Sequence, residues 1–272
     1  QLVGRLVFIY VLLTMLCCLT YWYLGMSFFD AINHAMTTLS TGGYSTHDKS
    51  FGYFESPLLR LNATFFMLMG GLPFVLYVKF MFSGKFDFFK DPQSKTFLYI
   101  AALSTAFITA ILYFQENQPA LDSFISSFFH VASVITTTGY AVGDYTLWSP
   151  LVTVLFFFLT YMGGCTGSTA GGLKTMRLVV AAQDTKAQFN RLIYRYGIFI
   201  PTYNGKALDR TLVVTVMSFL FVYIAFNVIL TVALELTGLD FETSVSGAAT
   251  AIANVGPGIG DFIGPAGNFS TL

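Results

Sequence analysis

Three stretches of the sequence decide the fold: FFDAINHAMTTLSTGGYSTHD (28–48), FISSFFHVASVITTTGYAVGD (124–144) and FETSVSGAATAIANVGPGIGD (241–261). Aligned on Gly43, Gly139 and Gly256, each has a Phe fifteen positions before the glycine and an Asp five positions after it. The residues between are moderately apolar and rich in Ala, Ser and Thr. A helix of about twelve residues rises ~18 Å, which is too short to cross a bilayer. The repetition predicts three re-entrant helices; the alternative is an ordinary outer loop with coincidental glycines.

The glycine near the end of each stretch indicates how the backbone leaves the short helix and returns to the outer surface. Non-helical backbone at membrane depth is tolerated only where protein buries it or where it lines a water-filled cavity. Glycine permits positive φ and close approach, and carbonyl oxygens in such a loop can replace the hydration shell of an ion. The C-terminal end of a short helix adds a partial negative charge, which favours a cation. The repeated stretches therefore predict a cation pore.

The composition places these stretches in a membrane protein. Of the 272 residues, 55% are hydrophobic and 10% are charged, against about 25% charged residues in soluble domains, and the mean hydropathy is +0.67. Uncharged runs at 6–25, 61–78, 96–115, 145–173 and 211–234 are each about long enough to span a ~30 Å hydrocarbon core. We therefore expect an all-α polytopic membrane protein. The composition excludes a secreted disulfide scaffold, a disordered chain and a basic nucleic-acid-binding domain.

The charges divide unequally when the connecting segments are assigned alternately to two sides. One side receives twelve of the 14 basic residues and the other receives ten of the 14 acids. The positive-inside rule makes the basic side cytoplasmic. Acids at the outer mouth, with Asp48, Asp144 and Asp261 after the three glycines, would concentrate cations there; the alternative is that acids are simply tolerated outside. His47 is expected to be exposed at this mouth.

A second site is predicted in the run GGCTGSTAGG (163–172). Its five glycines each cost a helix roughly 1 kcal/mol relative to Ala, so the span should break here. The alternative is a small-residue face for helix packing. Leu173 separates Gly172 from Lys174, so the run lacks the adjacent Gly-Lys of a phosphate-binding loop.

The segments LSTGGYSTHD, TTTGYAVGD, ANVGPGIGD and GGCTGSTAGGLKTMR resemble the Trk/Ktr family of potassium uptake proteins, in particular its TrkH/TrkG type of membrane subunit. The resemblance covers essentially the whole chain and implies successive M1, re-entrant pore-helix and M2 units around a central, potassium-channel-like pore. It implies the second repeat at 1–82, a cytoplasmic loop at 83–95, the third repeat at 96–178, a cytoplasmic connector at 179–210 and the fourth repeat, without its M2, at 211–272. The first repeat, which bears on the choice between potassium and sodium, falls outside the chain.

The resemblance also assigns residues to roles. It implies a selectivity filter of backbone carbonyls in which the third strand departs from the Thr-Gly-Tyr form, and a gate loop below it. The filter residues are Thr41, Gly42, Gly43, Tyr44, Thr137, Thr138, Gly139, Tyr140, Asn254, Val255, Gly256 and Pro257. The gate-loop residues are Gly163, Gly164, Cys165, Thr166, Gly167, Ser168, Thr169, Ala170, Gly171 and Gly172.

The same resemblance implies potassium uptake across the bacterial cytoplasmic (inner) membrane by a homodimer with a cytoplasmic nucleotide-binding subunit of the TrkA/KtrA type. Potassium is the transported ion, and no cofactor is expected in this chain. The basic segment 174–195 could contact that subunit or lipid head groups. The alternatives are a sodium/potassium co-transporting relative of the same fold, a broken-helix secondary transporter for another solute and an intramembrane protease using Ser168 with a histidine. His34 and His130 precede their filter glycines by nine residues, which favours a packing or hydrogen-bonding role.

Overall fold

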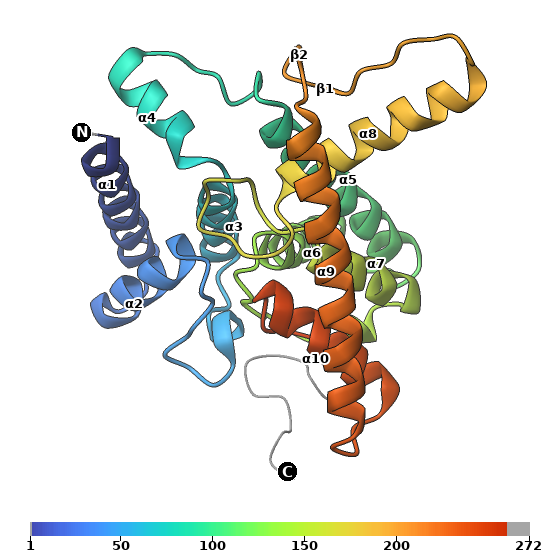
Figure 1. Cartoon of the computed structure of the whole chain (residues 1–272). Helices are drawn as coiled ribbons and strands as arrows, with labels where there is room; N and C mark the ends of the chain where they lie inside the picture. The colour runs from blue at the N-terminus through green and yellow to red at the C-terminus, as the bar shows by residue number, and fades with distance from the viewer. Residues whose placement is uncertain (1, 260–272) are drawn as a thin grey trace.

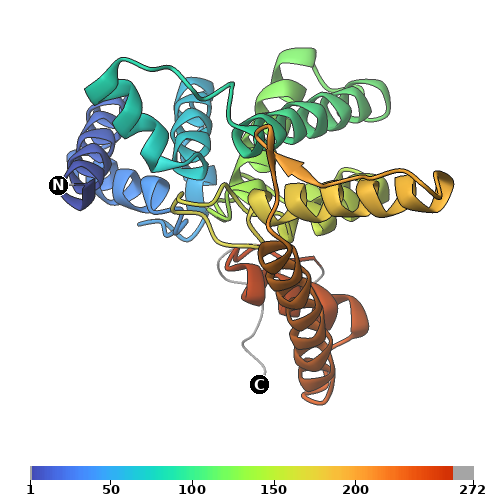
Figure 2. The same ribbon diagram turned by 45° about the horizontal axis from the view of Figure 1, so that its top comes forward.

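The computed structural model describes residues 2–259, in which helices form three groups around a common centre (Figures 1 and 2). The first group holds α1 (Leu2–Tyr23), α2 (Phe28–Leu39), the short η1 (Ser50–Tyr53), α3 (Pro57–Gly71) and α4 (Phe74–Ser83). The second group holds α5 (Pro92–Phe114), α6 (Ala120–Ile135), η2 (Tyr145–Leu147) and α7 (Pro150–Thr160). The third group holds α9 (Arg210–Glu235) and α10 (Phe241–Ala253).

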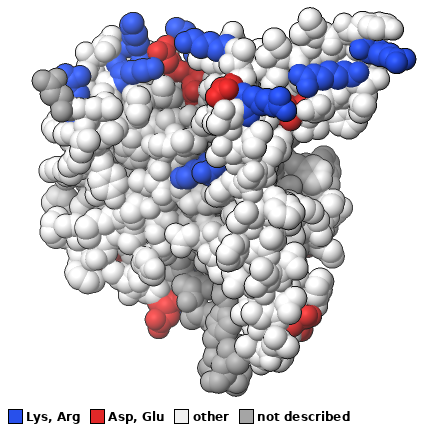
Figure 3. Space-filling model, viewed as in Figure 1, with Lys and Arg blue, Asp and Glu red and all other residues white. Residues whose placement is uncertain are grey.

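The second and third groups are joined by a segment that lies at one end of the molecule. It consists of α8 (Thr175–Ile193) and the antiparallel strands β1 (Thr202–Tyr203) and β2 (Lys206–Ala207). Side chains of Lys and Arg gather at this end, over α4, α8 and the hairpin (Figure 3). The basic residues are thus gathered at one end of the folded chain, as the sequence predicts.

Three short helices, α2, α6 and α10, are the re-entrant helices that the repeats predict. They have 12, 16 and 13 residues, and each follows a long first helix. Local capping starts two of them: Ser27 Oγ accepts the backbone N–H of Asp30 at 3.1 Å, and the Asp240 carboxylate accepts that of Thr243 at 3.2 Å. Pro119 precedes α6, so this helix starts four residues earlier than expected.

The span predicted over 61–78 is not one straight helix. It ends at Gly71, resumes at Phe74 and bends by 92°. Pro73 explains the break, because proline lacks an N–H and forces the residue before it out of the helical region. Leu72 is accordingly extended, with φ −89° and ψ 157°.

The span predicted over 145–173 is also broken. α7 ends at Thr160 after 11 residues, and residues 161–174 are not helical. Within the described residues, three helices (α1, α5 and α9) are long and apolar enough to cross a membrane, or four if the bent pair is one span. The sequence predicted five full spans, and the fourth, at 145–173, is interrupted at the glycine run where a break was expected.

An aromatic cluster joins the first two groups behind the centre of the molecule. Phe51 of η1 is fully buried, and its ring centroid lies 5.2 Å from those of Phe129 and Tyr140 and 6.0 Å from that of Tyr21. The ring of His34 meets it edge-on at 5.9 Å. Phe51 therefore packs helices from two repeats against each other.

We expect Phe51→Ala to destabilise the fold by about 3–5 kcal/mol, the usual effect of truncating a buried aromatic residue. The measurement is the thermal unfolding midpoint of the full-length protein in detergent. Phe65→Ala is the matched control, because Phe65 is 57% exposed on the same group of helices. Equal losses in the two variants would contradict the packing role of Phe51.

Candidate functional site

The three glycine loops share one backbone conformation. In each loop the aligned glycine (Gly43, Gly139 or Gly256) and the residue two positions before it have positive φ, while the residue between does not. The values are +52° and +66° for Thr41 and Gly43, and +56° and +82° for Thr137 and Gly139. In the third loop Asn254 and Gly256 have +59° and +100°. The third loop therefore keeps the conformation of the others despite its different sequence.

This conformation is strained where its first residue is threonine. A β-branched residue at positive φ is a true outlier, and such strain of about 1–3 kcal/mol gathers at functional sites. Thr41 and Thr137 carry it, whereas Asn254 is of a residue type that enters the left-handed region more readily. The repeated strain marks these loops as the best candidate site in the described chain.

Backbone N–H groups in the loops turn toward the short helices. Gly42 and Gly43 donate to the carbonyl of Thr37 at 2.8 and 3.3 Å, and Val255 donates to that of Thr250 at 3.0 Å. In the second loop Thr138 and Gly139 donate to the carbonyl of Ser133 at 2.9 and 3.2 Å. Each acceptor lies six residues before the aligned glycine of its loop, and all three are hydroxyl residues. Sequence reasoning missed this period, although it is visible in the alignment.

Neighbouring loops touch through their glycines. A Cβ on Gly43 would overlap the carbonyl oxygen of Thr138, and a Cβ on Gly139 would overlap that of Val255. A Cβ on Gly256 would meet no described atom within 4 Å. The loops therefore adjoin in the order of the chain, and among the described residues no fourth loop covers the glycine of the third.

The tyrosines that follow Gly43 and Gly139 have different surroundings. Tyr140 is buried, and its hydroxyl lies 2.7 Å from Thr37 Oγ1 and 3.1 Å from the carbonyl of His34, which it donates to. Tyr44, at the matching position of the first loop, is 78% exposed. The carbonyls of both tyrosines accept hydroxyl protons, from Thr37 at 2.8 Å and from Ser133 at 2.7 Å. They are therefore less free to face an ion than the carbonyls of the preceding residues.

The glycine run lies directly against the inner ends of all three short helices. The Thr169 hydroxyl donates to the carbonyl of Leu39 at 2.8 Å, where α2 ends. Gly171 N–H donates to Thr137 Oγ1 at 2.6 Å, just after α6, and Gly172 N–H donates to the carbonyl of Ala253 at 2.9 Å, where α10 ends. One non-helical segment thus contacts every repeat that the structure describes.

The segment also fills the bend between α3 and α4. Cys165 N–H donates to the carbonyl of Gly71 at 2.8 Å, and Phe74 N–H donates to that of Gly167 at 2.9 Å. A Cβ on Gly164 would lie 2.9 Å from the Gly71 carbonyl oxygen, so glycine is required for this approach. The alternative of a helical packing face is wrong, because residues 161–174 are not helical.

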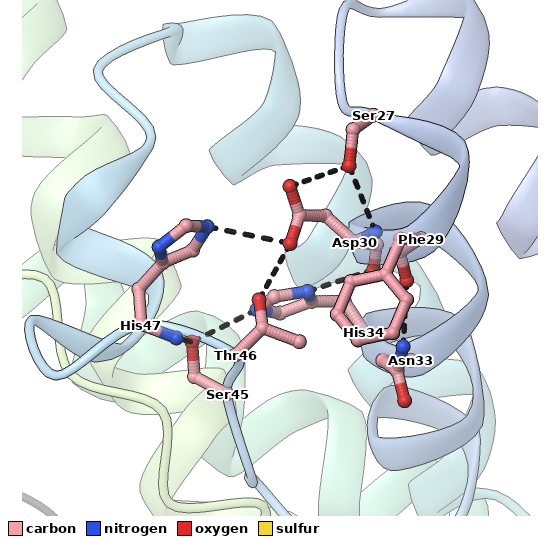
Figure 4. Close-up of polar contacts among 8 residues, drawn as sticks. All are labelled: Ser27, Phe29, Asp30, Asn33, His34, Ser45, Thr46 and His47. Carbon is pink, nitrogen blue, oxygen red and sulfur yellow. Dashed lines mark hydrogen bonds and ion pairs between the residues drawn. The ribbon is translucent and has the colours of Figure 1, made fainter.

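The predicted outer acids have different environments. Asp48 is exposed, whereas the Asp144 carboxylate caps η2 by accepting the backbone N–H of Thr146 at 2.8 Å. Asp261 lies outside the described residues. The outer acid with the most partners is Asp30, in the first turn of α2 (Figure 4). No role was predicted for Asp30, because two of its partners, Thr46 and His47, come from a separate loop.

Asp30 connects α2 to the loop that follows Gly43. Its carboxylate accepts hydroxyl protons from Ser27 at 2.7 Å and Thr46 at 2.6 Å, and lies 3.3 Å from His47 Nε2 (Figure 4). His47 stacks on Tyr53 with centroids 3.6 Å apart and is half-buried, so the prediction that it is exposed is wrong. Burial raises the pKa of Asp30, but the hydrogen bonds from Thr46 and Ser27 together with His47 outweigh it and hold the pKa below its usual value.

We expect Asp30→Asn to lower the thermal unfolding midpoint at pH 7 by about 2–4 °C, the effect of losing roughly 1 kcal/mol. A lowered pKa in the folded state contributes stability above the unfolded pKa of about 3.9, and this contribution is lost as pH falls through the folded value. The difference in unfolding midpoint between variant and wild type should therefore disappear below about pH 4. Asp48→Asn, at an exposed carboxylate, is the control; an equal, pH-independent gap in both would contradict the assignment.

The two predicted helix histidines are buried behind the loops. His34 places Nδ1 2.8 Å from the carbonyl of Asp30 and Nε2 3.0 Å from Ser45 Oγ. His130 places Nδ1 2.8 Å from the carbonyl of Ser126 and packs edge-on to Trp148 at 5.0 Å. Both therefore serve packing and hydrogen bonding, as expected. Among the residues that the structure describes, no group of His, Cys, Asp and Glu could hold a metal ion.

The helices and loops define a class: an all-α polytopic membrane protein with repeated re-entrant helices that bring strained glycine loops together. A family model described as a cation transport protein, TrkH, matches residues 1–271. The chain belongs to this TrkH family. Because its named relatives are transporters, the intramembrane-protease alternative is wrong.

Individual relatives agree with the family assignment. The chain is 44% identical over 265 residues to the Trk system potassium uptake protein TrkI of Halomonas elongata, covering 97% of this chain and 54% of that protein. It is 35% identical over 254 residues to the Trk system potassium uptake protein TrkG of Escherichia coli, covering 92% and 52%. The crystal structure of the potassium transporter TrkH from Vibrio parahaemolyticus superimposes with a TM-score of 0.91 at 31% identity, covering 97% of this chain and 57% of that one. The chain thus spans about half the length of the relatives it matches.

Proposed function

We propose that this chain supplies part of the wall of a potassium-conducting pore, with the three glycine loops as its selectivity filter. The observation that carries the proposal is their shared backbone conformation, with N–H groups turned to the short helices and each loop packed against the next. Relatives named as potassium uptake proteins support the choice of ion. Membership of a cation transport family favours it over a broken-helix transporter for another solute.

In this proposal, backbone carbonyls offset the dehydration of the ion. The carbonyls of 41–43, 137–139 and 254–256 are the main ligands, because those of Tyr44 and Tyr140 already accept hydroxyl protons. The C-terminal ends of α2, α6 and α10 precede these ligands, so their partial negative charges favour a cation.

A further repeat completes the ring in this proposal. The three loops leave two open edges, at exposed Tyr44 and at Gly256. Tyr140 contacts α2 of the preceding repeat, so by the same relation Tyr44 would contact a short helix of another repeat. We assign the second, third and fourth repeats to 1–82, 96–178 and 211–272, with cytoplasmic segments at 83–95 and 179–210.

Gating is assigned to residues 163–172. This segment is bonded below all three loops and would obstruct a central path. Hydrogen bonds, each worth about 1 kcal/mol net, hold it to α3, α4, α5 and the short helices, and its residues Cys165 and Ala170 are buried. In this proposal, opening breaks several of these contacts together. The acids of the opposite end, including Asp48, would concentrate cations at the entrance.

The cellular setting follows from the basic end and from the family. We assign the end with α4 and α8 to the cytoplasm under the positive-inside rule, in the cytoplasmic membrane of a bacterium. A homodimer and a nucleotide-binding regulatory subunit are the expected partners. A sodium/potassium co-transporting mode is the second candidate, and ion competition in the flux assay below distinguishes it.

Gly139→Ser should reduce the selectivity for potassium over sodium, because a Cβ at this position overlaps the Val255 carbonyl oxygen. The measurement is potassium and sodium flux from proteoliposomes that contain the full-length protein. Gly143→Ser is the matched control, since a Cβ there meets nothing within 4 Å. Unchanged ion ratios in Gly139→Ser would reject the filter assignment, and sodium-dependent potassium flux would favour co-transport.

Thr169→Val should raise the open fraction roughly fivefold, the equivalent of about 1 kcal/mol, without changing ion selectivity. The variant keeps the side-chain shape but removes the donor to the Leu39 carbonyl. Single-channel recording measures the open fraction directly. Thr166→Val in the same segment is the control, because the Thr166 side chain is exposed. The gate assignment fails if both variants behave as wild type.

A further inference from the structure

We propose that a cavity between α8 and α9 binds the head group of a phospholipid that carries a phosphate and a primary ammonium. The cavity has a volume of about 590 Å³, within the usual range of ligand sites of ~300–1,000 Å³. Its lining brings together Arg191 and Asp184 of α8 with Arg210 of α9. The site lies apart from the glycine loops, so the inference does not depend on the proposed pore.

The cavity lies where a lipid head group would meet the protein. Arg210 is the first residue of α9, a helix apolar enough to cross a membrane. The large apolar side chains Val214 and Phe221 of α9 are 55% and 75% exposed, as expected of a lipid-facing surface. The cavity is therefore at the boundary between the apolar span and the basic end of the molecule (Figure 3).

The segment on the other side of the cavity has the composition of a membrane-interface element. After Arg191, Tyr194 and Tyr196 are 60% and 93% exposed, and Ile198 is 89% exposed. Exposed Tyr next to basic and apolar residues is typical of the interfacial region of a bilayer. These side chains would rest on the bilayer beside the cavity.

The two arginines fit the phosphate. Guanidinium groups bind phosphate oxygens through paired, charge-assisted hydrogen bonds. Arg191 Nη2 donates to the carbonyl of Phe199 at 2.7 Å, which orients the group and leaves its other N–H donors available.

The carboxylate in the lining selects among phosphate-bearing head groups. Asp184 would repel a purely anionic head group but would accept hydrogen bonds from a primary ammonium. Two arginines and one aspartate thus match one phosphate plus one ammonium, the chemistry of phosphatidylethanolamine. Apolar lining from Val213 and Met217 offers a surface for the glycerol and the first acyl carbons.

The test is binding of short-chain phosphatidylethanolamine to the full-length protein in detergent, measured by native mass spectrometry. Phosphatidylglycerol, phosphatidylcholine and inorganic phosphate are compared under the same conditions. Arg191→Gln and Arg210→Gln should each weaken phosphatidylethanolamine binding about tenfold, the loss expected for a hydrogen bond to a charged group. Asp184→Asn should remove the preference over phosphatidylglycerol. Arg195→Gln is the control, because this nearby arginine does not line the cavity.

Each alternative outcome overturns a stated part of the proposal. Equal binding by wild type, Arg191→Gln and Arg210→Gln would overturn the site. Tighter binding of phosphatidylglycerol than of phosphatidylethanolamine by the wild type would overturn the head-group assignment. Inorganic phosphate binding as tightly as the lipid would overturn the lipid assignment. None of these outcomes depends on ion flux, so a failure here is distinguishable from a failure of the proposed pore.

Discussion

The structure depends on the cost of leaving backbone polar groups unpaired where water is scarce. Such a group costs several kcal/mol in hydrocarbon, and this chain breaks two of its helices at membrane depth. The breaks lie together, so that the carbonyl of Gly71 at the bend after α3 accepts the N–H of Cys165 in the break after α7. Pairing two irregular segments in this way removes the penalty for both. It also holds the second segment beneath the ends of the short helices.

The need to pair backbone polar groups also explains the conformation of the glycine loops. Their N–H groups are taken by carbonyls of the short helices, and hydroxyls such as Thr37 and Ser133 reach the outer carbonyls. The carbonyls between lack these partners, and an ion is a suitable substitute for them. The strained φ of Thr41 and Thr137 persists because neighbouring loops and helices hold the backbone from both sides. The glycine loops thus have neighbours that hold them on several sides, and residues 163–172 lie against the ends of the short helices.

Much of the plan of the fold could be read from local sequence. The starts of α2 at Phe28 and of α10 at Phe241 agree with the starts of the repeated stretches, because capping residues act within a few positions. The break in the run 163–172 was predictable for the same reason. The bend at Pro73 had an equally local signal, but the continuous apolar character of 61–78 outweighed it in the prediction.

The sequence by itself determined that this is a membrane protein of repeated short helices ending in glycine loops, because period, apolarity and glycine are properties of neighbouring residues. Only the tertiary structure decided which loops adjoin, that Asp30 meets His47, and that Arg191 and Arg210 share a cavity. These contacts join separate segments of the chain, some of them a hundred residues apart, as with Tyr140 and Thr37. Their formation is set by how packed helices and paired backbone groups fit together, and no local pattern encodes it.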